Sequence, residues 1–134
     1  MKKFINYLEK NPELIIRRLK NNNQMLEDIE ATIVVENKIF SPTTALDMAE
    51  IYEEILNIVV TLEFFSVELP SDVRTELILL GKENLRRFSS LAVAETKNDG
   101  NLAIFIHAIV NHLPFNFGLL NYNENKSVAV VGSD

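Results

Sequence analysis

A length of 134 residues, with 47% hydrophobic and 24% charged residues, is typical of one folded domain and argues against a disordered or fibrous chain. The absence of cysteine excludes disulfides, thiolate metal sites and cysteine nucleophiles. The formal net charge of −6 is unevenly distributed, because the first twenty residues carry six basic and two acidic side chains and the acidic residues concentrate further along.

The amino-terminal segment predicts a short helix over residues 2–9 and no export signal. Its positively charged start is followed by polar residues such as Asn6, Glu9 and Lys10, which interrupt any apolar run. No stretch of the chain reaches the length of about 18 apolar residues that a membrane-spanning helix needs. We therefore expect a cytoplasmic location and no membrane partner.

A second helix is predicted to begin at Asn11-Pro12-Glu13. Asparagine is a favoured helix cap, proline suits the first helical position, and an acidic residue in the first turn complements the helix dipole. Apolar residues continue at helical spacing as far as Ile29. The run Asn21-Asn22-Asn23 predicts a break into two helices, and residues 32–40 predict a small β-hairpin.

Ser41-Pro42 predicts the start of the most informative helix, which covers residues 43–66. Its polar residues recur at steps of three and four, and almost all of the others are apolar. The polar residues therefore form one narrow stripe, made of Thr43, Asp47, Glu50, Glu54, Asn57 and Thr61, with Glu53 beside it. So narrow a stripe predicts a central helix that other helices, or a partner, cover on several sides.

Acidic residues concentrate in and around this helix. Between residues 39 and 73 there are seven acidic side chains and no basic one. Such a surface disfavours nucleic-acid binding and suits a protein partner with a basic surface. We predict a partner-binding site made of Asp47, Glu50, Glu53, Glu54 and Asn57. The alternative is that the stripe is a solvated face that only keeps the protein soluble.

Leu69-Pro70 predicts the end of the central helix, and Ser71 predicts the cap of the next one. The short basic clusters Arg17-Arg18 and Arg86-Arg87 are interpreted as solvated surface or as partners of the acidic helix, with RNA contact by residues 2–20 as the alternative. Gly81 predicts the close approach of another backbone, because glycine in a helix interior costs about 1 kcal/mol relative to alanine.

The last predicted helix covers residues 102–112, where an apolar run reaches Asn111-His112 before Pro114 stops it. Residues 119–131 predict a second small hairpin. Together these elements predict a mainly α chain. We expect a single domain over residues 1–134, folded as a bundle of about five helices with one or two small β-hairpins.

No catalytic or cofactor-binding pattern emerges from the sequence. His107 and His112 lie about 140° apart around a helix, so they do not converge on one metal, and His107 is expected to be a hydrogen-bonded core residue. The four glycines are isolated, so they assemble neither a P-loop nor a dinucleotide-binding loop. Asp47, Glu50 and Glu54 share a face, but no loop adds the further oxygens of a magnesium or calcium site. We expect no enzyme activity, metal or cofactor.

In its small size, acidity and lack of chemistry motifs, the chain resembles small bacterial immunity proteins. This resemblance implies an inhibitor-type protein that masks a macromolecular partner, such as a toxin or nuclease with a basic surface. The alternative function is a homo-oligomeric structural or adaptor module, for example a homodimer. Such a module would bury the apolar residues of segments 51–65 and 102–110 between copies.

Overall fold

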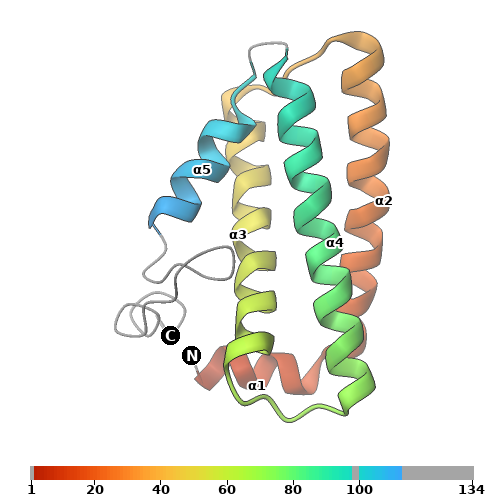
Figure 1. Ribbon diagram of the computed structural model, residues 1–134, viewed down its shortest axis with the longest axis vertical. Coiled ribbons are helices and arrows are strands. Elements are labelled where there is room, and N and C mark those ends of the chain that lie inside the picture. The colour runs from red at the N-terminus through yellow and green to blue at the C-terminus, as the bar shows by residue number, and fades with distance from the viewer. Residues whose placement is uncertain (1, 98–99, 113–134) are drawn as a thin grey trace.

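The computed structural model describes residues 2–97 and 100–112, which form five helices (Figure 1). They are α1 (Lys2–Lys10), α2 (Pro12–Glu36), α3 (Pro42–Phe64), α4 (Ser71–Thr96) and α5 (Leu102–His112). No strand occurs within these ranges, which confirms that this part of the chain is mainly α. None of these five helices combines the length and the apolar character needed to cross a bilayer.

The three long helices stand side by side, and the two short ones pack on them (Figure 1). α4 contacts both α2 and α3, and α5 packs on α3 and α4. α1 crosses the end of the molecule where α2 and α4 begin and α3 ends (Figure 1). The core between the helices is formed by fully buried side chains from all five, including Leu8, Leu19, Leu26, Leu62, Leu77, Phe88, Leu91 and Leu102.

α2 is longer than predicted and runs unbroken through Asn21-Asn22-Asn23, so the predicted break is wrong. Asparagine is only a moderately poor helix former, and the buried residues Leu19 and Leu26 on either side hold the segment against the core. Asn84 of α4 adds a cross-connection, because its side-chain amide donates a hydrogen bond to the Leu19 carbonyl at 2.9 Å. Tertiary packing therefore outweighs the local preference.

The hairpin predicted at residues 32–40 is also wrong, because residues 32–36 form the last turns of α2. Ile33 is buried in the core, so the β-branched run supplies a helix face rather than a strand. The helix then stops at Asn37, whose left-handed backbone conformation (φ 52°) is a common helix ending. The hairpin predicted at residues 119–131 lies outside the described residues.

α3 begins as predicted, with the Ser41 hydroxyl accepting a hydrogen bond from the Thr44 amide at 3.2 Å and Pro42 in the first turn. The backbone carbonyls at and just after the carboxyl-terminal end of α3 receive hydrogen bonds from another helix. The Arg74 guanidinium of α4 donates to the carbonyls of Leu62, Phe65 and Val67. Ser71 is the first residue of α4 rather than its cap. Such capping of one helix end by a side chain from the next helix is not visible in local sequence patterns.

α5 is attached to the other helices by Glu95, a fully buried residue of α4 that sequence analysis did not identify. One carboxylate oxygen accepts a hydrogen bond from the Leu102 amide at the start of α5 (2.8 Å), and the other accepts one from the Phe40 amide before α3 (2.6 Å). Gly100 lies so close that an added Cβ would overlap the Glu95 side chain. This carboxylate thus connects three separate segments of the chain.

Candidate functional site

The predicted partner-binding residues all lie on α3, but the structure places them in different surroundings. Asp47 and Glu50 are exposed, and Glu53 is half-buried. Among the described residues, none of these three carboxylates forms an ion pair or a hydrogen bond. They are spaced at i, i+3 and i+6, so they extend over about 9 Å of the helix surface. We call these three residues the α3 acidic face.

Glu54 differs from the α3 acidic face because its charge is already paired. The Arg18 guanidinium of α2 lies 2.6 Å from its carboxylate, and both side chains are roughly half exposed. Partial burial opposes the charged form of Arg18, but the attraction of the Glu54 carboxylate, together with hydrogen bonds to Glu54 and Tyr7, raises its pKa above the ordinary value. Glu54 therefore ties α3 to α2 and offers little free charge to a partner.

Asn57 also differs from the prediction. Its side chain is half-buried, and its amide oxygen is buried with no hydrogen-bond partner among the described residues. A buried polar atom without a partner costs free energy, so Asn57 is directed toward the protein rather than toward an incoming surface. The carboxylates of the predicted site that have no partner within the described residues are therefore those of the α3 acidic face.

The basic residues of α4 are paired within the chain, but the predicted pairing of Arg86-Arg87 with the acidic helix does not occur. Of the two arginine clusters it is Arg18 that pairs with α3. Lys82 pairs with Glu63 of α3 at 2.8 Å. Arg86 pairs with Glu83 at 2.5 Å, and Arg87 lies 3.2 Å from Glu27 of α2. Hydrogen bonding from Arg86 is the main cause that lowers the pKa of Glu83 below its ordinary value.

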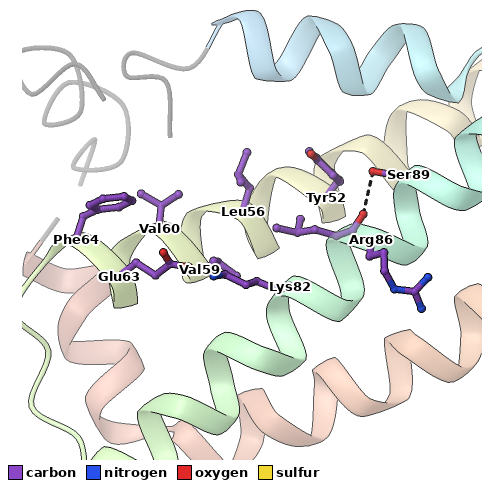
Figure 2. Close-up of a pocket in the computed structure, with 10 residues that line it drawn as sticks. Tyr52, Leu56, Val59, Val60, Glu63, Phe64, Lys82, Arg86 and Ser89 are labelled. Atoms are coloured by element: carbon purple, nitrogen blue, oxygen red, sulfur yellow. Dashed lines mark hydrogen bonds and ion pairs between the residues drawn. The ribbon is translucent and has the colours of Figure 1, made fainter. Parts of the chain in front are cut away.

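Sequence analysis did not identify a groove between α3 and α4 (Figure 2). Its volume is about 540 Å³, and its apolar part is formed mainly by Leu56, Val59, Val60 and Leu85. Tyr52 lies at one end, where its ring packs edge-on against Phe88 with a centroid distance of 5.8 Å. The groove is lined by residues of two separate helices, so no pattern within one segment predicts it.

Neither histidine nor carboxylate geometry points to a metal centre. His107 is exposed on α5, so its predicted place in the core is wrong. This follows from its position on the helix side opposite Leu102 and Phe105, which face the other helices. Within residues 2–97 and 100–112 no group of three or more histidine, aspartate or glutamate side chains could hold a metal ion. The segment Phe115-Asn116-Phe117, which the sequence predicts as a loop just after Pro114, lies outside the described residues.

Comparison with known proteins adds no functional assignment. A scan against protein-family models gives no match, and searches of curated proteins and of solved structures give none either.

Proposed function

We propose that this chain is a non-catalytic binding protein that masks or inhibits a protein partner with a basic surface, and that the α3 acidic face makes the contact. The observation that supports this proposal is the unpaired state of Asp47, Glu50 and Glu53. Glu27, Glu54, Glu63, Glu76 and Glu83 have a cationic partner within the chain, whereas other carboxylates without an ion pair among the described residues, such as those of Glu13 and Glu68, lie outside α3.

The charge arrangement of the α3 acidic face is unfavourable for the chain by itself. Like charges at i, i+3 spacing on a helix destabilise it by about 0.2–0.5 kcal/mol per pair. Lysine or arginine side chains of a partner would relieve this repulsion on binding. An acidic surface also accelerates association with a basic protein by electrostatic steering. A toxin or nuclease that binds a nucleic acid has a surface of the required sign.

The competing idea of a homo-oligomeric module is less well supported. It started from the apolar residues of segments 51–65 and 102–110, and those of α3 are largely buried against the chain's own helices. Intramolecular packing thus explains most of the α3 part of that feature, whereas Ile104 of α5 remains 66% exposed. We further propose that the helices form one bundle-type domain over residues 1–134 and that it acts in the cytoplasm.

The proposal is tested by charge reversal on the α3 acidic face. Two baits are used in a native cell extract: the wild-type chain and the triple variant Asp47→Lys, Glu50→Lys, Glu53→Lys. The captured protein is then identified and purified. We expect a basic protein that the wild-type chain retains. At low salt its association rate constant with the triple variant should fall by at least about tenfold, because steering is lost.

A matched control carries the same change in net charge elsewhere. Glu13→Lys, Glu36→Lys and Glu68→Lys replace exposed acidic residues that lie outside the α3 acidic face. This control should retain the partner with an association rate constant close to the wild-type value. Equal rate constants for all three proteins, with unfolding midpoints showing that all are folded, would contradict the proposed contact surface.

A further inference from the structure

The groove between α3 and α4 has the size and composition of a ligand site. Its volume of about 540 Å³ lies within the range of roughly 300–1,000 Å³ that is typical of small-molecule pockets. Tyr52, Leu56, Val60 and Phe64 rise from the same side of α3, as their i, i+4 spacing requires, and Leu85 of α4 completes the apolar lining (Figure 2). From Tyr52 to Phe64 the helix rises by about 18 Å, so the site is elongated.

One end of the groove carries a tyrosine hydroxyl that has no hydrogen-bond partner among the described residues. Tyr52 is only 4% exposed, and its contact with Phe88 fixes the ring. Tyr52 lines the groove (Figure 2). Its hydroxyl makes no hydrogen bond with any of the described residues. Tyrosine hydroxyls that lie against apolar surface usually have a hydrogen-bond partner, and this one remains accessible enough to receive a partner from a bound molecule. A ligand in the groove would supply that partner.

The charges around the groove cancel. At the end opposite Tyr52, Lys82 and Glu63 form an ion pair at 2.8 Å. The Arg86 guanidinium points away from the groove (Figure 2) and is held by Glu83 through hydrogen bonds of 2.5 and 3.0 Å. A charged ligand group would therefore lose its hydration without gaining a free counter-charge, which is costly.

We propose that this groove binds an elongated, uncharged ligand: an alkyl or aryl chain with one hydroxyl or carbonyl group that accepts a hydrogen bond from Tyr52. The apolar chain of the ligand lies along Leu56, Val60 and Leu85. The site is separate from the α3 acidic face, because it uses neither Asp47 nor Glu50.

The ionisation of Tyr52 agrees with its role as a donor. Burial raises the pKa of Tyr52 above its ordinary value. Its hydroxyl therefore keeps its proton at neutral and mildly alkaline pH, where it is available to an acceptor oxygen.

The test uses three probes with the same alkyl chain: octan-1-ol, octanoate and octylammonium. Each is titrated into the full-length chain at neutral pH, and binding is followed by backbone amide shifts. We expect saturable shifts at Leu56, Val60 and Leu85 with octan-1-ol. For both charged probes the dissociation constant should be at least tenfold larger. The absence of saturable binding, or equal affinity for the charged probes, would overturn the proposal.

Two variants separate this site from non-specific binding of an amphiphile. Tyr52→Phe removes only the hydroxyl, so octan-1-ol should bind about threefold to tenfold more weakly while toluene, which has no polar group, binds as before. Leu85→Trp fills the groove and should weaken octan-1-ol binding at least tenfold. The control Leu79→Trp adds the same side chain at a position of α4 that is 63% exposed and outside the groove.

Unchanged octan-1-ol affinity in Tyr52→Phe or in Leu85→Trp would refute the proposed mode of binding. Nuclear Overhauser contacts between Leu85 and residues 113–134 in the probe-free protein would refute the proposal as well, because they would assign the groove to the chain's own segment. Contacts between Leu85 of one copy and residues 113–134 of another, detected with mixed isotope labels, would assign the groove to a dimer interface and would also refute the proposal.

Discussion

At the scale of single residues, the Glu95 carboxylate joins segments that lie far apart in the chain. Its two carboxylate oxygens accept one backbone hydrogen bond each, from Phe40 and from Leu102, and no water is needed to satisfy those donors. Hydrogen bonds to a charged acceptor are stronger than those between neutral groups. Glu95 therefore fixes where α5 begins and where the chain enters α3.

We expect Glu95→Gln to lower the free energy of unfolding by about 1–3 kcal/mol, because glutamine leaves one of the two buried amides without an acceptor. The measurement is urea unfolding, combined with hydrogen exchange at Phe40 and Leu102, where protection should fall. The control Glu68→Gln, at an exposed position, should change stability by less than about 0.5 kcal/mol. A variant as stable as the wild type would show that burying the charge costs as much as its hydrogen bonds contribute.

Glu83 gives the protein a pH dependence of known sign. Hydrogen bonding from Arg86 is the main cause that lowers its pKa below the ordinary value of 4.5. The folded state therefore binds this proton less readily than the unfolded state does. The resulting stabilisation is present above the unfolded-state pKa and is lost as the pH falls through the folded-state pKa.

The corresponding measurement compares the wild-type chain with Glu83→Gln across pH 7 to pH 2. The wild type should be the more stable of the two at neutral pH, and the difference should shrink progressively below about pH 4.5. The effect should be small and should diminish in 1 M salt, because the pair lies at the surface. A difference that stays constant over this pH range would show that Glu83 acts through packing and not through its charge.

At the scale of helices, α3 and α4 depend on each other through one close contact. A methyl group at Gly81 of α4 would collide with Cγ2 of Val59 on α3. Glycine is conformationally unfavourable within a helix, yet here it permits the two helices to approach. The predicted close approach of another backbone at Gly81 is wrong, because the atoms nearest to an added Cβ belong to the Val59 side chain.

Gly81→Ala should destabilise the protein by about 1 kcal/mol. The gain in helix propensity is about 1 kcal/mol, and overpacking against Val59 costs about 1–3 kcal/mol. In a Val59→Ala background the collision disappears, so the same substitution should become neutral or stabilising. A double-mutant cycle by urea unfolding measures this coupling, and a coupling energy near zero would show that Val59 is not the obstacle.

At the scale of the whole molecule, the packing of the helices decides which charges remain available. α2 and α4 bring cations next to Glu54 and Glu63 but leave Asp47, Glu50 and Glu53 unpaired among the described residues. The same packing opens a neutral apolar groove on another side of α3. The chain therefore offers two surfaces of opposite character, and a homodimer stays a prediction that neither surface requires.

The sequence by itself determined much of the secondary structure. Asn11-Pro12 and Ser41-Pro42 marked the starts of α2 and α3, and the apolar run from Leu102 marked α5, because helix-start residues and periodicity are local properties. The Asn11 side chain, however, makes no capping hydrogen bond and donates instead to the Tyr7 carbonyl of α1. Local rules failed where packing opposed them, at Asn21-Asn22-Asn23 and at residues 32–36. In both places buried side chains hold a helix that short-range preferences disfavour.

Of the five predicted site residues, the sequence correctly indicated a shared location on α3, since spacing alone fixes a helix face. Only the tertiary structure decided which of them are free, because the pairing of Glu54 with Arg18 joins residues 36 positions apart. The buried carboxylate of Glu95 and the groove beside Tyr52 likewise depend on segments distant in the chain. Contacts of this kind follow from how whole helices pack, and no short stretch of sequence contains them.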